Sequence, residues 1–112
     1  MEVTVIAQEP VTVLAVQGSI DGLTAEPLTQ TLAGHIDAGR VKLIADMSGV
    51  PYISSAGLRS LLIALKSTRG KGGDFRLAAV QPAVLNVLSI AGFTKLIRIF
   101  DNTPMAISSF AN

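Results

Sequence analysis

The sequence predicts an α/β fold: a mixed, mostly parallel sheet of about five strands with about four helices. Two observations support this class. Short apolar runs rich in β-branched residues alternate with longer segments whose apolar residues recur at helical spacing. The first two apolar runs are separated by only a short break, which predicts an antiparallel hairpin before that alternation begins. The expected order is β-β-α-β-α-β-α-β-α.

The opening hairpin is predicted over residues 3–16. Val3, Val5 and Ala7 are apolar and alternate with Thr4 and other residues, as in a strand with one buried face. Pro10 interrupts this pattern because proline has no backbone N–H to donate to a strand ladder. The apolar run 11–16 then predicts the second strand, and the glycine-containing segment 18–22 predicts a loop.

A first helix is predicted to follow this loop. Thr24 is a candidate N-cap, and Leu28, Leu32 and Ile36 are spaced four residues apart, so they share one face of a helix. Gly39 is expected to end the helix. The apolar run 41–45 predicts a central strand that ends at Asp46, with a loop over residues 47–53.

The second helix has the clearest pattern in the chain. Its apolar residues fall at helical spacing: Leu58, Leu61, Leu62 and Leu65. The glycine-rich segment 70–73 ends this helix, and the run 75–80 predicts the next strand.

The last part of the chain repeats the alternation of helix and strand. Pro82 is expected to open a third helix that Gly92 closes. This helix carries Val84, Leu85, Leu88 and Ile90. Residues 96–100 predict a last strand, and Asn102 is expected to cap a short final helix that runs through Phe110.

The composition excludes several classes of protein. In 112 residues there is no cysteine, the net charge is +1 and aromatic residues make up 4%. Disulfides and thiolate metal sites are excluded, and nucleic acid is not an expected partner. The longest apolar runs fall well short of the roughly 20 residues that span a membrane, so no membrane insertion is expected. We expect one domain, residues 1–112, in the cytoplasm.

No motif for catalysis or for a cofactor is found in the sequence. Ser48 lacks the Gly-x-Ser-x-Gly turn of hydrolases, and the segment 70–73 lacks the spacing of a phosphate-binding loop. The single histidine, His35, has no second ligand near it in the sequence, so no metal site is expected. The chain is therefore expected not to be an enzyme and to need no cofactor.

Ser54 and Ser55 stand immediately before the second helical pattern, where backbone amides have no partner within the helix. A serine there has two uses. Its hydroxyl can cap the helix by accepting a hydrogen bond from an amide two or three residues further on. Alternatively, it can be phosphorylated, because the added charge would meet free amides and the positive end of the helix dipole. Position alone leaves both open.

The segment 44–61 resembles the signature of STAS domains, the anti-sigma factor antagonists of bacteria and their relatives. In that pattern an apolar strand ends in Asp, a loop with an aromatic residue follows, and Asp/Ser-Ser-x-Gly-Leu opens a helix. The chain has Asp46, Tyr52 and Ser54-Ser55-Ala56-Gly57-Leu58 at these places. Weaker matches are Gly18-x-Ile20-Asp21, the Gly72-Gly73 pair, Gln81-Pro82-Ala83-Val84 and Gly92-Phe93. The resemblance covers essentially the whole chain.

The resemblance implies that Ser55 is the phosphoacceptor for an anti-sigma factor serine kinase. In the family, the unphosphorylated antagonist binds the anti-sigma factor and the phosphorylated form is released. The residues expected to contact the partner are Asp21, Ser54, Ser55, Ala56, Gly57, Leu58 and Arg59. Two neighbours depart from the best-known pattern, because Ser54 replaces an acid and Ala56 replaces a second hydroxyl residue.

Several alternatives stay open. The chain could instead be a non-switching STAS accessory subunit of a transport or signalling complex, or a module that binds a small ligand. Asp21 and Asp46 could simply form turns, and Arg59 could lie on a solvated helix face. The edge of the opening hairpin could pair with a second copy, which would give a homodimer.

Overall fold

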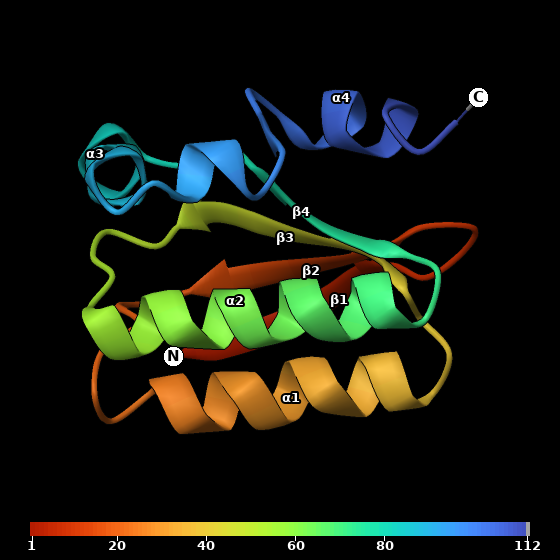
Figure 1. The fold of residues 1–112 in the computed structure, drawn as a ribbon, viewed down its shortest axis with the longest axis horizontal. Helices are drawn as coiled ribbons and strands as arrows, with labels where there is room; N and C mark the ends of the chain where they lie inside the picture. Colours follow the sequence, from red (N-terminus) through yellow and green to blue (C-terminus); the bar gives the residue numbers. More distant parts are fainter. Residues whose placement is uncertain (112) are drawn as a thin grey trace.

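The computed structural model describes residues 1–111, which form a five-stranded sheet with helices on both faces (Figure 1). The elements are β1 (Glu2–Ala7), β2 (Thr12–Gln17), α1 (Ala25–Asp37), β3 (Lys42–Gly49), α2 (Ser55–Gly70), β4 (Asp74–Ala78), α3 (Pro82–Ile90), the 3-10 helix η1 (Phe93–Lys95), β5 (Ile99–Phe100) and α4 (Thr103–Ser108). The predicted class and the predicted order of strands and α-helices are confirmed.

The strands lie in the sheet in the same order as in the sequence, β1-β2-β3-β4-β5. β1 and β2 form the expected antiparallel hairpin, and the other neighbouring pairs are parallel. Because β2, β3 and β4 run the same way, the loops that leave them gather at one end of the sheet. That end also holds the first residues of α1, α2 and α3, on the left in Figure 1.

Two apolar cores lie on opposite faces of the sheet. α1 and α2 lie side by side across one face, where Leu14, Leu43 and Phe75 of the strands are fully buried (Figure 1). α4 packs on the other face through Ala106 against a smaller cluster that includes Ile44. The alternation of side chains along each strand therefore divides the apolar residues between two helix layers.

The third strand is longer than predicted. It continues past Asp46 to Gly49, because Met47 is fully buried and Gly49 pairs with Gln17 of β2. Gly49 also accepts a hydrogen bond from the Gly18 amide at 2.9 Å. The predicted loop therefore begins only at Val50.

The predicted strand over residues 96–100 is wrong in its first half. The amides of Leu96 and Ile97 donate to the Phe93 carbonyl at 2.9 Å, so these residues continue the turn of η1 and leave only Ile99 and Phe100 for β5. In α3, Val84 and Leu88 are buried as the helical spacing requires, whereas Leu85 and Ile90 are exposed. The last helix ends at Ser108, two residues before the predicted Phe110.

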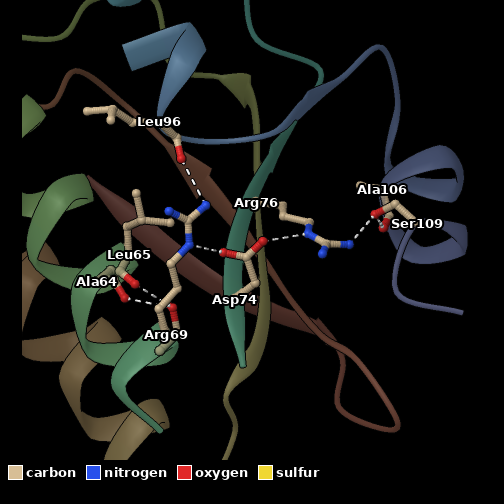
Figure 2. A network of polar contacts seen from close by, with 9 residues as sticks. Ala64, Leu65, Arg69, Asp74, Arg76, Leu96, Ala106 and Ser109 are labelled. Atoms are coloured by element: carbon tan, nitrogen blue, oxygen red, sulfur yellow. Dashed lines mark hydrogen bonds and ion pairs between the residues drawn. The ribbon is translucent and has the colours of Figure 1, made fainter. Parts of the chain in front are cut away.

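A polar network joins the C-terminal ends of α2 and α4 to the first half of β4 (Figure 2). The carboxylate of Asp74 accepts hydrogen bonds from Arg69 and Arg76, each at 2.9 Å. Arg69 also donates to the Leu96 carbonyl, and Arg76 donates to Ser109 Oγ. Partial burial alone would raise the pKa of Asp74, but the hydrogen bonds and charges of the two arginines outweigh it, so the pKa is lowered.

Candidate functional site

The loop before α1 and the loop before α2 are joined by backbone hydrogen bonds. Ile20 and Ile53 form an isolated parallel bridge. The Ile20 amide donates to the Tyr52 carbonyl at 3.0 Å, and the Ser54 amide donates to the Ile20 carbonyl at 2.8 Å. These bonds place the start of α2 next to the segment that carries Asp21.

Asp21 organises the start of α1. Its carboxylate accepts hydrogen bonds from the amides of Leu23 at 2.9 Å and Thr24 at 3.1 Å, and these bonds lower the pKa of Asp21. The Thr24 hydroxyl accepts from the Asp21 amide and donates to the Ser19 carbonyl. Thr24 is the N-cap residue of α1, as predicted, but its side chain makes no capping hydrogen bond, because that hydroxyl is used within the loop instead.

Ser54 is the N-cap of α2. Its Oγ accepts a hydrogen bond from the Gly57 amide at 3.2 Å, and its carbonyl accepts from the Leu58 amide at 2.9 Å. Ser55 is the first residue of the helix and is exposed. Of the two uses that position alone left open, capping falls to Ser54, and the Ser55 hydroxyl is not needed for it.

Gly57 is buried where the first turn of α2 meets the joined loops. A Cβ atom at this position would lie 2.6 Å from Ile53 Cγ1, 2.8 Å from Ile20 Cγ2 and 3.0 Å from the Ile20 carbonyl oxygen. Any side chain would push the helix start away from the loops. Gly57 therefore sets how closely the turn that carries Ser55 approaches the Ile20 segment.

Ser60 ties the same turn region of α2 to α1. Its buried Oγ donates to the Ala25 carbonyl at 2.9 Å and accepts from Thr29 Oγ1 at 2.7 Å. No sequence signal singled out this residue, because an isolated serine in a helix is usually solvated. Together with Ser54 and Gly57, it fixes α2 at its Ser55 end.

The remaining predicted contact residues differ in what they can present to a partner. Ala56 and Leu58 are half-buried and pack against the main core, and Gly57 is buried. Only Ser55 and Arg59 among the predicted contact residues of α2 are exposed. Of the predicted contact residues on α2, these two therefore present the most exposed side chains, and Gly57 is buried.

Two other candidate residues, Asp46 and His35, lie outside the joined loops and the Ser55 end of α2. Asp46 accepts from the Ser48 amide and from Thr103 Oγ1 of α4, each at 3.0 Å, so it braces the end of β3 on the α4 side of the sheet. His35 accepts a hydrogen bond at Nδ1 from Arg40 at 2.8 Å. Desolvation by burial lowers the pKa of His35 most, and the positive charge of Arg40 lowers it further.

Exposed apolar side chains occur in the two joined loops and further along α2. Leu23 is 88% exposed in the loop before α1, and Tyr52 is 54% exposed in the loop before α2. Ile63, two turns after Ser55 on α2, is 46% exposed. Periodicity did not identify Leu23 or Tyr52 as surface residues, because both lie in loops where no regular spacing applies.

Within residues 1–111, no group of three or more His, Asp or Glu side chains is placed to hold a metal ion. In the same part of the chain, no helix combines the length and apolar character that crossing a membrane requires.

Comparison with known proteins identifies the family. A family model described as the STAS domain matches residues 2–106. BtrV of Bordetella bronchiseptica, provisionally named an anti-sigma factor antagonist, is 30% identical over 110 residues, which cover 98% of this chain and 95% of BtrV. The resemblance carried by the segment 44–61 is confirmed.

Solved structures agree with this assignment. An anti-sigma factor antagonist from Mycobacterium paratuberculosis has a TM-score of 0.90 at 25% identity, covering 99% of this chain and 94% of that one. The Bacillus cell fate determinant SpoIIAA in its phosphorylated form has the same fold, with a TM-score of 0.71 at 17% identity and 96% of each chain covered. This chain belongs to the STAS domain family.

Proposed function

We propose that this chain is an anti-sigma factor antagonist that acts in the cytoplasm, where it binds a kinase-type anti-sigma factor through the Ser55 end of α2. Phosphorylation of Ser55 then releases the partner. The names of the relatives support the general role. The observation that carries the finer proposal is that Ser54 supplies the helix cap, whereas Ser55 is exposed at the start of α2 and its hydroxyl makes no hydrogen bond within residues 1–111.

The chemistry expected at Ser55 is phosphoryl transfer by the partner. Ser55 Oγ attacks the γ-phosphorus of the ATP bound to the partner, the bond from that phosphorus to the β,γ-bridging oxygen breaks, and ADP leaves. The hydroxyl proton goes to a base of the kinase. The product phosphate is favoured at this position, because the first amides of a helix and the positive end of its dipole attract anions.

Binding before phosphorylation is supported by an apolar surface. Leu23 and Tyr52 are exposed in the two joined loops at the start of α2, and Ile63 is exposed further along this helix; exposed apolar and aromatic residues are typical of the centre of an interface. Ser55 is neutral in this state, so covering it costs little. Phosphorylation adds a charge of about −1.5 to −2, which the partner would have to desolvate, and the complex is weakened.

The proposal is tested with four immobilised baits: the parent chain, Ser55→Ala, Ser55→Asp and Ser54→Ala. Proteins retained from a lysate of the source organism are identified by mass spectrometry, and the retained anti-sigma factor is purified. We expect the parent, Ser55→Ala and Ser54→Ala to retain it and Ser55→Asp to retain much less. Equal retention by Ser55→Asp would contradict the electrostatic release.

The purified partner is then incubated with each chain and labelled ATP. We expect phosphate on Ser55 in the parent and in Ser54→Ala, and none in Ser55→Ala. Ser54→Ala is the matched control, because it removes a neighbouring hydroxyl and weakens the helix cap without removing the acceptor. A retained partner that never phosphorylates the parent would favour the alternative role, a non-switching accessory subunit.

A further inference from the structure

Ser55, the proposed phosphate acceptor, and Arg59, a cation, lie one turn apart on the same side of α2. Residues four apart on a helix are neighbours, with about 5–6 Å between their Cβ atoms, so Arg59 lies directly beyond Ser55. Both residues are exposed. Within residues 1–111 the ion pairs engage Arg69, Lys71 and Arg76, and Arg59 takes part in none of them.

The direction of the helix favours contact between these two side chains. Side chains on an α-helix lean toward its N-terminus, so an arginine at position 59 can reach back to the turn that begins at Ser55. An anion that precedes a cation by four residues is also the more favourable order on a helix. The guanidinium group can donate two parallel hydrogen bonds to a phosphate, which a lysine in its place could not do.

Arg59 also lines a small cleft between α1 and α2, with a volume of about 170 Å³. Glu26 of α1 supplies the acidic side chain of this cleft, and its Oε1 accepts a hydrogen bond from Gln30. No ion pair joins Glu26 and Arg59 within the described residues. Arg59 is therefore available to a stronger anion nearby.

We propose that Arg59 is the internal counter-ion of phosphorylated Ser55. This inference rests on the proposed function, since it concerns the phosphorylated state of the same site. Phosphorylation then has two effects on the docking surface. It adds a dianion at Ser55, and it pairs the Arg59 charge, which in the unmodified protein is open to a partner. Arg59 is a positioning residue in this scheme, because it holds the phosphate against α2.

The test uses protein in which phosphoserine is introduced at position 55 during synthesis, so that no kinase is needed. Phosphorus-31 NMR follows the titration of the phosphate in the parent, Arg59→Gln, Arg59→Lys and Lys66→Gln. Lys66→Gln removes the same charge from the same helix, but 11 residues and about 16 Å from Ser55, beyond the Debye length at 0.15 M salt.

We expect Arg59→Gln to raise the midpoint of the phosphate titration by about 0.3 pH units, the size expected for an ion pair between residues four apart on a helix. Arg59→Lys should fall between Arg59→Gln and the parent, and Lys66→Gln should match the parent. The difference between parent and Arg59→Gln should shrink at 1 M salt, where the Debye length is about 3 Å.

Equal midpoints in the parent and Arg59→Gln would overturn the counter-ion proposal. An equal rise in Lys66→Gln would also overturn it, because the effect would then come from net charge alone. Neither result bears on whether a kinase modifies Ser55. Conversely, a partner that never phosphorylates Ser55 would refute the proposed function and leave this titration unchanged.

Discussion

The role of Gly57 gives the sharpest prediction about how this fold positions its site. Gly34 and Gly57 are both helical glycines, and replacing either by alanine makes the same chemical change. At Gly34, in the exposed part of α1, an added Cβ would meet nothing within 4 Å. At Gly57 it would meet Ile53 at 2.6 Å and Ile20 at 2.8 Å.

The expected magnitudes follow from these distances. Gly34→Ala should stabilise the protein by about 1 kcal/mol, because alanine loses less backbone entropy on entering a helix. Gly57→Ala gains the same amount, but the new methyl group is about 0.8 Å too close to Ile53, which is almost fully buried. Overpacking of this kind costs about 1–3 kcal/mol. The net loss is expected to be up to about 2 kcal/mol.

The assay is urea unfolding followed by far-ultraviolet circular dichroism. The free energy of unfolding of Gly57→Ala should lie about 1–3 kcal/mol below that of Gly34→Ala, because the cost of overpacking separates the two variants. Their melting temperatures should differ by about 10 °C. If Gly57→Ala were as stable as Gly34→Ala, the close packing of α2 on the joined loops would be refuted.

Three further predictions use the same assay. Asp74→Asn should lower the free energy of unfolding at pH 7 by about 2 kcal/mol, because it removes the carboxylate that two arginines share. Since the pKa of Asp74 is lowered in the folded state, this difference between parent and variant should disappear as the pH falls below the usual pKa range of an aspartate side chain. The lowered pKa of His35 means that protonation favours the unfolded chain, so the parent should lose stability as the pH falls from about 6.5. His35→Gln should lose less stability over the same pH range. An equal loss in both proteins would contradict the role of His35. Ser60→Ala should cost about 1–2 kcal/mol, since it leaves Thr29 and the Ala25 carbonyl without a partner in α2, and an unchanged midpoint would contradict that reasoning.

The regular elements were predictable because their residues follow simple periods. Leu28, Leu32 and Ile36 are buried on one face of α1 as their spacing requires. The errors lie where the backbone makes bonds that periodicity does not describe. Leu96 and Ile97 are apolar like strand residues, but their amides bond within a tight turn to Phe93.

The candidate site was predictable in part. The position of Ser54 and Ser55 at a helix start followed from local pattern, because helix caps depend on residues close in sequence. The bridge between Ile20 and Ile53 was not predictable, since it joins residues 33 positions apart through backbone groups that every sequence has. The same holds for Ser60, whose partners Ala25 and Thr29 lie on another helix.

Phosphate on Ser55 is expected to separate this chain from its partner. The most direct measurement is the Kd of the purified anti-sigma factor for two forms of the chain, one with serine and one with phosphoserine at position 55, determined by isothermal titration calorimetry. Burying a charge to which the partner supplies no countercharge costs about 2–5 kcal/mol, so the phosphorylated form should bind at least about 30-fold more weakly. Equal Kd values for the two forms would refute release of the partner by phosphorylation.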